Sequence, residues 1–274
     1  MKSILFTDLD GTLLDRDSKL SWRNRKALWN LGHRGFLRVA VTGRSLFSAQ
    51  QALKKGFPLE YLITSNGAGI FDFRSGELIT SYYLSQETTA AAIELLLSLK
   101  VDFMVHAPVP DNHNFVFHRS GGENHDFSSR CERYRDFCSP LDPNHSGSKK
   151  ASQFLIVVTP DKDPEYQHRV FQDLFPKLSV IRTTSPLDQR SCWIEIFPPL
   201  VSKAKAADWL SRYLGMERRS SFAVGNDYND LDLLEWSHRS VVVANAPAEL
   251  RRRFTVVAGY DRDGFAEAVE IWTS

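Results

Sequence analysis

The chain reads, from residue 4 to residue 12, Ile4-Leu5-Phe6-Thr7-Asp8-Leu9-Asp10-Gly11-Thr12. The apolar run at the start of this stretch predicts a buried strand, and the glycine after the second aspartate predicts a turn. In an extended segment Asp8 and Asp10 share a face, where their mutual repulsion must be offset by a cation or a shared proton. The stretch therefore predicts a strand that ends at a metal-dependent site.

Two other interpretations of the aspartates involve no catalysis. Asp10-Gly11 is by itself an ordinary turn signal, with Asp8 capping the segment that follows. A calcium loop of the EF-hand type also opens with alternating acids, but its glycine and closing glutamate positions hold Leu13 and Lys19 here. The plain turn therefore stays an alternative at this point, whereas the calcium loop is excluded.

The size and charge of the chain bear on its partners. Its 274 residues suffice for one large domain or two modest ones, and we favour two. The 34 basic and 33 acidic residues leave a net charge of +1, which gives no general attraction for nucleic acid or an anionic membrane. We expect neither as a partner, and any anion must be recognised locally.

The cysteines and apolar segments predict a cytoplasmic protein. Cys131, Cys138 and Cys192 are odd in number and form no C-x-x-C pair, which is typical of thiols in a reducing compartment. Only three strongly apolar residues precede the first acids, which is too few for a signal peptide. No apolar run approaches the length that spans a bilayer. We therefore expect a soluble cytoplasmic protein.

Strands and helices alternate near both ends of the chain. Apolar runs that stop at polar residues predict strands, and capped segments with helical periodicity predict the helices between them. The alternation implies right-handed crossovers and a doubly wound, Rossmann-like parallel sheet of the α/β class, with its ligand beyond the carboxyl ends of the strands. We expect strands at 4–6, 36–41, 61–64, 221–224, 241–244 and 255–258, and helices at 22–31, 46–55, 231–236 and from Pro247.

The middle of the chain has a different pattern. Most of its strand-like segments can pair as antiparallel neighbours with helices on one face, which is an α+β arrangement. Residues 120–150, rich in Ser, Gly, Asp and Asn, predict a long loop with at most one short helix. We predict a core of residues 1–83 and 199–274 and an inserted domain of residues 84–198. The elements expected there are helices 86–99 and 164–175 and strands 102–105, 114–118, 154–159, 180–183 and 192–197.

Four motifs, in order along the chain, resemble those of the haloacid dehalogenase (HAD) superfamily. They are Asp8-Leu9-Asp10-Gly11-Thr12, Thr42-Gly43-Arg44, a lysine that opens a helix at Lys203, and the segment from Gly225 to Asp230. The insertion after the third strand, together with Ser65-Asn66-Gly67-Ala68, is similar to the subclass with a C2-type cap, the Cof-like phosphatases. The resemblance covers the full chain and implies phosphoryl transfer through an aspartyl-phosphate.

The resemblance also implies roles for the motif residues. Asp8 would be the nucleophile. Asp10 would protonate the leaving oxygen and then take a proton from the attacking water, while its backbone carbonyl contacts the metal. Thr42 would donate to a phosphoryl oxygen, and Lys203 would pair with the nucleophile and the phosphate. Lys205 is the register alternative, but two residues further on it leaves that face of the helix.

Further candidates lie on the substrate side of the motifs. Arg44, which follows Gly43, could reach a remote anionic group with its planar guanidinium, and a solvated arginine is its plainer explanation. Asn66 resembles a family position near the substrate entrance, and Asn-Gly is equally a turn signal. Candidates in the inserted domain, each with a solvated strand end as the plainer explanation, are His118, Arg119 and Arg182.

The fourth motif departs from the family pattern, which has Gly-Asp, two residues and Asn-Asp. This chain has Asn226 where the first acid belongs, so the ligand there is a neutral oxygen and the affinity for Mg²⁺ could be weaker. Asp227 could restore the missing charge, and which of the two contacts the metal stays open. Asp230 would hold a metal-bound water. The expected cofactor is Mg²⁺, with ligands drawn from Asp8, Asp10, Asn226, Asp227 and Asp230. No zinc site is expected, because no ligand spacing links His106, His113, His125 and His145.

The expected activity is Mg²⁺-dependent hydrolysis of a small phosphorylated metabolite, with a sugar phosphate as the favoured class. An inserted domain that closes over the site would exclude macromolecules and bulk water. Two alternatives remain open: a phosphomutase of the same superfamily, and a non-catalytic sensor of phosphorylated metabolites. The residues are equally compatible with a monomer and a homodimer.

Overall fold

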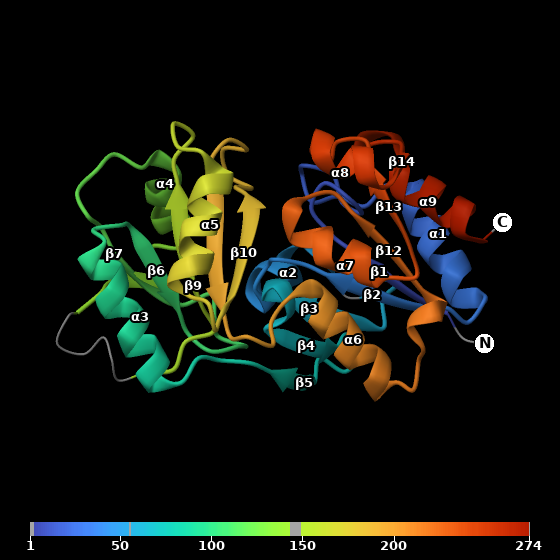
Figure 1. The fold of residues 1–274 in the computed structure, drawn as a ribbon. Helices are drawn as coiled ribbons and strands as arrows, with labels where there is room; N and C mark the ends of the chain where they lie inside the picture. Colours follow the sequence, from blue (N-terminus) through green and yellow to red (C-terminus); the bar gives the residue numbers. More distant parts are fainter. Residues whose placement is uncertain (1–2, 55, 143–148, 274) are drawn as a thin grey trace. The chain divides into compact units, whose positions relative to one another are not determined.

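The computed structural model describes residues 3–54, 56–142 and 149–273 of the chain (Figure 1). Lys55, at the end of the helix predicted for 46–55, lies outside the described residues, as do residues 143–148, which include His145. The chain divides into two compact units. The first comprises residues 1–44, 48–80 and 202–274, and the second comprises residues 45–47 and 81–201.

The first unit is built on a mostly parallel sheet. Within the described residues its eight strands have the order β14-β13-β12-β1-β2-β3-β4-β5, parallel from β14 to β3, with β4 antiparallel to β3. Strands that are buried on both faces are apolar throughout, which explains the short apolar runs of the sequence. The strands are β1 (Ile4–Thr7), β2 (Leu37–Val41), β3 (Tyr61–Thr64), β4 (Gly69–Asp72), β5 (Leu78–Ser81), β12 (Ser221–Gly225), β13 (Arg239–Val243) and β14 (Thr255–Val257).

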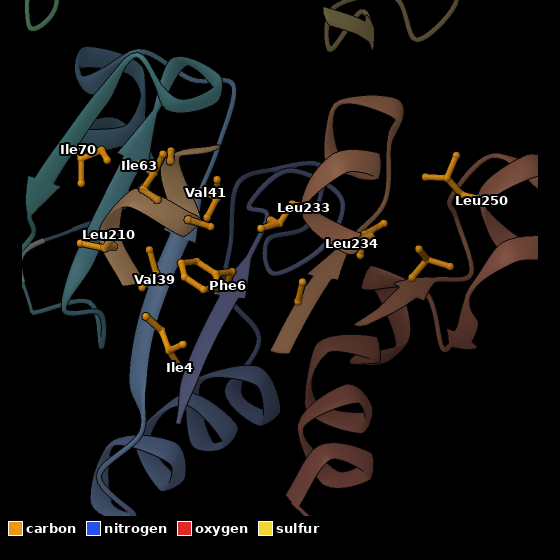
Figure 2. Close-up of a cluster of buried hydrophobic side chains, with 14 of the residues drawn as sticks. Ile4, Phe6, Val39, Val41, Ile63, Ile70, Leu210, Leu233, Leu234 and Leu250 are labelled. Carbon is orange, nitrogen blue, oxygen red and sulfur yellow. The ribbon is translucent and has the colours of Figure 1, made fainter. Parts of the chain in front are cut away.

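Helices cover both faces of this sheet. On one face Phe6 lies in a buried cluster with Leu210 of α6 and Leu233 of α7 (Figure 2). On the other face Phe222 stacks on Trp272 of α9, and α1 lies beside α9 although they come from opposite ends of the chain (Figure 1). The helices of this sheet are α1 (Trp22–His33), α2 (Leu46–Ala52), α6 (Lys203–Tyr213), α7 (Leu231–Trp236), α8 (Ala248–Arg253) and α9 (Gly264–Thr273).

The second unit is an α+β arrangement. Its six strands within the described residues have the order β10-β11-β9-β6-β7-β8, antiparallel except for the parallel pair β7 and β8. Alternate residues of β9 separate the two faces: Phe154 and Ile156 pack with α3 and α5, whereas Leu155 and Val157 pack with Phe127 of α4. The elements are α3 (Gln86–Ser98), β6 (Phe103–His106), β7 (Phe115–His118), α4 (His125–Arg133), β8 (Cys138–Pro140), β9 (Gln153–Val158), α5 (Pro164–Leu174), β10 (Ser179–Thr184) and β11 (Cys192–Phe197).

The predicted fold class is confirmed, since a parallel sheet with helices on both faces is interrupted by an α+β unit. The structure adds β4, β5, β8 and α9, which the sequence pattern did not predict. The helix allowed within 120–150 is α4, where Asn124 accepts a hydrogen bond from the N–H of Phe127 and the last turn carries Arg130 and Arg133. Among the described residues no helix is both long and apolar enough to cross a bilayer, and no disulfide joins Cys131, Cys138 and Cys192.

A buried ion pair links β2 to the residue before β3. Arg38 donates from Nε and Nη2 to the two carboxylate oxygens of Glu60 at 3.0 and 2.5 Å, and from Nη1 to Leu28 O at 2.9 Å. The side chains of Arg38 and Glu60 are only 8% and 13% exposed. Burial acts to raise the pKa of Glu60, but the hydrogen bonds and charge of Arg38 outweigh it and hold that pKa below its ordinary value.

We predict that Glu60→Gln lowers the free energy of unfolding by about 3 kcal/mol near neutral pH, because the Arg38 guanidinium stays buried without a counter-charge. Since the folded pKa of Glu60 is lowered, its contribution is complete above the ordinary value of 4.5 and is lost as the pH falls through the folded value. The stability difference between wild type and variant, measured by urea unfolding, should therefore shrink in acid. Arg74→Met removes a 70% exposed partner of the same carboxylate and should cost less than about 1 kcal/mol. Equal losses in the two variants would contradict this assignment.

Candidate active site

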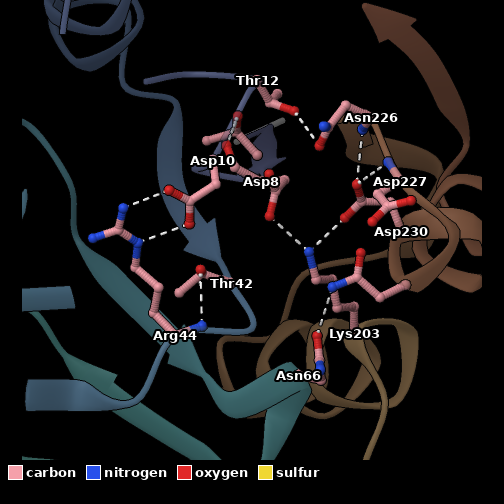
Figure 3. Close-up of polar contacts among 12 residues, drawn as sticks. Asp8, Asp10, Thr12, Thr42, Arg44, Asn66, Lys203, Asn226, Asp227 and Asp230 are labelled. Atoms are coloured by element: carbon pink, nitrogen blue, oxygen red, sulfur yellow. Dashed lines mark hydrogen bonds and ion pairs between the residues drawn. The ribbon is translucent and has the colours of Figure 1, made fainter. Parts of the chain in front are cut away.

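Four neighbouring strands of the first unit end at polar side chains. The sheet order places β12, β1, β2 and β3 side by side and parallel. Asp8 follows β1, Thr42 follows β2, the turn η1 (Ser65–Gly67) follows β3, and Asn226 follows β12. Because parallel strands present their carboxyl ends at one edge of the sheet, these residues gather there (Figure 3).

A buried lysine lies between two carboxylates at this edge. Lys203 Nζ donates to Asp8 Oδ1 at 2.7 Å and to Asp230 Oδ1 at 2.5 Å, and the lysine side chain has no exposed surface (Figure 3). Burial opposes the charge of Lys203, but the two carboxylates raise its pKa above the ordinary value. Burial also raises the pKa of Asp8 to about 7, against the effect of the lysine charge. The three side chains form one buried ionic cluster.

The first turn of α6 brings the lysine to this cluster. Ser202 caps the helix by accepting a hydrogen bond from the N–H of Lys205. A Cβ on Gly67, whose φ is +112°, would lie 2.6 Å from Ser202 O, so glycine is needed where η1 approaches the start of α6. Within this turn Lys203 is the lysine that reaches Asp8, while Lys205 is exposed.

Asp230 organises the turn after β12. Its Oδ2 accepts hydrogen bonds from the N–H groups of Asn226 and Asp227 at 2.7 and 3.0 Å, while its other oxygen accepts from the buried lysine. A Cβ on Gly225 would lie 2.7 Å from the Asp230 side chain, so the glycine lets the carboxylate fold back onto the turn. The Asp227 side chain caps the same turn by accepting from the N–H of Tyr228 at 2.8 Å. These contacts fix the backbone position of Asn226 and therefore the point from which its side chain projects.

The Asn226 amide points at the aspartates. One of its terminal atoms lies 3.2 Å from Asp8 Oδ2, 3.2 Å from the backbone oxygen of Asp10 and 3.0 Å from Thr12 Oγ1. Within the part of the chain that the structure describes, no cluster of three or more His, Cys, Asp or Glu side chains could hold a metal. A carboxylate oxygen, a backbone carbonyl oxygen and one end of an amide nevertheless converge here, and the oxygen atoms of these three groups suit a hard divalent cation such as Mg²⁺.

Asp10 is held by an arginine from the neighbouring strand end. Arg44 donates from Nε and Nη2 to the two carboxylate oxygens of Asp10 at 2.7 and 2.5 Å. The guanidinium also donates to Ser18 Oγ at 2.6 Å and to Ser48 O at 3.2 Å, and the Arg44 N–H donates to Thr42 Oγ1 at 3.1 Å. The Asp10 side chain is 42% exposed, against 8% for that of Asp8, so the two aspartates face different environments.

The turn η1 presents a buried asparagine in a left-handed conformation. Asn66 has a φ of +53°, its N–H donates to Thr42 O at 3.0 Å, and its side-chain oxygen accepts from Asn229 Nδ2 at 3.0 Å. A Cβ on Gly43 would lie 3.5 Å from Asn66 Oδ1, which is ordinary contact distance. Gly43, Asn66 and Asn229 therefore border one another beside the ionic cluster.

The first unit brings together the residues of all four motifs. Those gathered are Asp8, Asp10, Thr42, Gly43, Arg44, Asn66, Lys203, Asn226, Asp227 and Asp230. The candidates from the inserted segment belong to the second unit: His118 ends β7, Arg119 follows it and Arg182 lies in β10. Their proposed contact with substrate stays a prediction.

Several contributing residues were missed from the sequence. Thr12 contacts the Asn226 amide, Ser18 accepts from Arg44, and Asp232 accepts from the N–H of Ala204 at 3.2 Å in the first turn of α6. Burial raises the pKa of Asp232. Thr12 stands inside the first motif and could have been noticed there, whereas the other contacts depend on how distant segments meet.

Comparisons with known proteins identify the family of the chain. A family model described as haloacid dehalogenase-like hydrolase matches residues 5–269. The chain is 27% identical to a 5-amino-6-(5-phospho-D-ribitylamino)uracil phosphatase of Bacillus subtilis, over 96% of this chain and 95% of that protein. It is 28% identical to an HMP-PP phosphatase of Cronobacter sakazakii, over 89% of this chain and 84% of that protein.

Solved structures support the same fold. The HAD subclass IIB sugar phosphatase BT4131 superposes with a TM-score of 0.79 at 20% identity, over 99% of both chains. BT1666 from Bacteroides thetaiotaomicron superposes with a TM-score of 0.81 at 21% identity, over 100% of this chain and 96% of the other.

The chain belongs to the haloacid dehalogenase-like hydrolase family, and it is a phosphatase enzyme of that family. The resemblance drawn from the four motifs, including its Cof-like subclass, is confirmed.

We predict that Lys203→Met destabilises the protein by about 3 to 5 kcal/mol, because two carboxylates stay buried without a counter-charge. The loss should grow as the pH rises, since the folded variant must keep a carboxyl protonated that the unfolded chain ionises. Urea unfolding at several pH values, with a chelator present, measures this. Lys205→Met, which removes an exposed lysine two residues along the same helix, should cost less than about 1 kcal/mol. Matching losses in both variants, or a Lys203→Met loss that is constant with pH, would count against the ionic cluster.

Proposed function

We propose that this protein is a Mg²⁺-dependent phosphatase that hydrolyses a small phosphorylated metabolite, of the sugar phosphate class, through an aspartyl-phosphate on Asp8. The observation that carries the proposal is the buried cluster of Asp8, Lys203 and Asp230 at the carboxyl edge of a parallel sheet. A carboxylate held against a buried ammonium group is suited to meet a phosphate, whose oxygens would otherwise repel it.

The proposed ligands for Mg²⁺ are Asp8, the backbone carbonyl of Asp10 and the amide oxygen of Asn226, because one end of this amide lies 3.2 Å from Asp8 Oδ2 and 3.2 Å from Asp10 O. Asp227 and Asp230 bond to the turn that carries Asn226, so we propose that they orient this ligand and add negative charge near the ion. When bound, Mg²⁺ would neutralise charge on the phosphate and so weaken its repulsion of an anionic nucleophile.

Asp8 and Asp10 are proposed to divide the covalent and proton-transfer chemistry. In the first step a carboxylate oxygen of Asp8 forms a bond to phosphorus while the bond from phosphorus to the leaving oxygen breaks, and Asp10 gives that oxygen a proton. In the second step Asp10 takes a proton from a water, whose oxygen bonds to phosphorus as phosphate leaves Asp8. Lys203 and the Thr42 hydroxyl would stabilise the phosphoryl oxygens in both steps.

Arg44 is proposed to position Asp10. Its guanidinium engages both oxygens of this carboxylate and is itself held by Ser18 and Ser48, so it fixes the resting place of the acid–base group. Protonation of Asp10 would weaken these bonds, because the guanidinium binds an ionised carboxylate more strongly than a neutral acid. Gly43, Arg44 and Asn66 are proposed to border the bound substrate.

The substrate class rests on the comparisons. The Bacillus subtilis relative is named for a phosphorylated ribitylamino-uracil and the Cronobacter sakazakii relative for HMP-PP, while BT4131 is described as a sugar phosphatase. These are small phosphorylated molecules, and a substrate of this size is what we propose here. A panel of phosphorylated sugars, assayed for release of free phosphate, tests the class.

Two alternatives differ from the proposal in measurable ways. A phosphomutase of the same superfamily would return the phosphoryl group to a sugar, so an isomer would form in place of free phosphate. A non-catalytic sensor is suggested by Asn226, which brings one charge fewer to the metal, but the family of the chain favours an enzyme, and Asp8, Asp10, Thr42 and Lys203 retain the groups that catalysis needs. A sensor would bind phosphorylated sugars and turn over no activated aryl phosphate.

We predict that Asp8→Asn lowers turnover of an aryl phosphate by more than about 10³-fold, because an amide cannot form the acyl-phosphate bond. Phosphate release in the presence of Mg²⁺ measures this. Asp17→Asn, which removes a 72% exposed carboxylate nine residues further on, is the matched control and should keep wild-type turnover. Turnover of Asp8→Asn within about tenfold of wild type would overturn Asp8 as the nucleophile.

A further inference from the structure

One end of the Asn226 amide is surrounded mainly by hydrogen-bond acceptors, which favour the amide nitrogen over the oxygen at that position. If its oxygen faces inward, Thr12 Oγ1 can donate to it at 3.0 Å, but Asp8 Oδ2 and Asp10 O are acceptors and repel it. If its nitrogen faces inward, it can donate to both acceptors at 3.2 Å while Thr12 Oγ1 accepts at 3.0 Å. The Thr12 hydroxyl can donate or accept and so satisfies either orientation. In the absence of a cation, the inward nitrogen is the better-bonded state.

The same position suits an oxygen once a cation is present. Neighbouring oxygens around an octahedral Mg²⁺ lie about 3 Å apart, given metal–oxygen distances of about 2.1 Å. The inward atom of Asn226 lies 3.2 Å from Asp8 Oδ2 and 3.2 Å from Asp10 O, which is close to that spacing. With its oxygen at this position, Asn226 could therefore join Asp8 and the Asp10 carbonyl as a ligand without movement of the backbone.

A half-turn of the Asn226 amide requires no movement of the backbone. The backbone of Asn226 is fixed by the bond from its N–H to Asp230 Oδ2 at 2.7 Å. The outward end of the amide lies against Gly11, where a Cβ would come 3.0 Å from Nδ2, so the glycine leaves room for either terminal atom. A half-turn about the last side-chain bond exchanges oxygen and nitrogen while the shape stays nearly the same.

We propose that the Asn226 amide is a switch that responds to the metal: its nitrogen bonds Asp8 and Asp10 in the metal-free protein, and its oxygen turns inward to ligate Mg²⁺. This inference rests on the proposed metal site and adds how its side chains are stabilised before the cation binds. An aspartate at 226 would put a second anionic oxygen about 3 Å from Asp8 Oδ2, and Lys203 already bonds Asp8 and Asp230. The asparagine stabilises the metal-free site and lowers its affinity for the cation.

The first test is Mg²⁺ binding without substrate, measured by calorimetry on the full chain. Asn226→Asp should bind Mg²⁺ at least tenfold more tightly than wild type, and its metal-free form should melt at a lower temperature, with the gap closing when Mg²⁺ is added. Asn245→Asp is the matched control, because Asn245 Nδ2 donates to Gly11 O on the same loop and the new charge does not replace the Asn226 amide. Its Mg²⁺ affinity should stay within about twofold of wild type. Equal affinity of wild type and Asn226→Asp, or equal tightening in both variants, overturns the switch.

The second test observes the switch in the wild-type protein. The side-chain NH₂ resonances of Asn226, assigned by their loss in Asn226→Asp or, should that variant fail to fold, in Asn226→Ser, should exchange slowly with water in metal-free protein. Mg²⁺ should shift them and speed their exchange, because the nitrogen then faces outward. Resonances that Mg²⁺ leaves unchanged overturn the switch. If the wild-type protein hydrolyses a phosphate ester but gives the contrary result in both tests, the switch is wrong and the proposed function stands. The Asp8→Asn experiment decides that function separately.

Discussion

The arrangement of this site depends on the bond of one lysine to two carboxylates. Asp8 follows β1 and Asp230 lies in the turn after β12, and these strands are neighbours in the sheet. Two buried carboxylates so close would repel each other strongly, and Lys203 makes their burial possible. Because α6 begins at this lysine, the two bonds also hold the start of the helix against the carboxyl edge of the sheet.

Each acidic group at the sheet edge has a partner before any cation arrives. Asp8 is bonded by Lys203, Asp10 by Arg44, and Asp230 by Lys203 and two backbone N–H groups. Asn226 contributes a neutral amide to this set in place of a further carboxylate. Counted as ionised groups, Asp8, Asp10, Asp227 and Asp230 carry four negative charges against the two positive charges of Lys203 and Arg44. In the proposed mechanism a divalent cation would supply the balancing charge, and the phosphate would enter with it.

The parts of the fold that the sequence predicted are those where one local signal suffices. Apolar runs that stop at polar residues located β1, β2, β3 and β12, and the ordered motifs placed their ends at one edge of the sheet. The strand β4 is as long as β1 and β3, but it begins with Gly69 soon after the three-residue turn η1, so its short apolar segment merges with the turn signal. The strand β8 has only three residues, which is too short to show a periodic pattern. Helix α4 was recognisable only as a possible interruption of a polar loop.

The contacts of the site were harder to predict than its members. The sequence placed Arg44 near the strand end, but its bidentate bond to Asp10 depends on the approach of two loops that are 34 residues apart. Asp227 and Asn226 were equal candidates for the metal in the sequence, and the capping of the turn by Asp227 toward Tyr228 distinguishes their surroundings. Such choices follow from tertiary geometry, which spacing along the chain does not determine.

The most direct measurement of the central claim is the location of the phosphoryl group during turnover. The enzyme is mixed with an aryl phosphate and Mg²⁺, quenched in acid within the first turnover, digested and analysed by mass spectrometry. The account predicts a phosphoryl group on the Asp8 side chain that disappears as phosphate is released. A phosphoryl group on another residue, or steady hydrolysis with no phosphorylated peptide at any quench time, would contradict it.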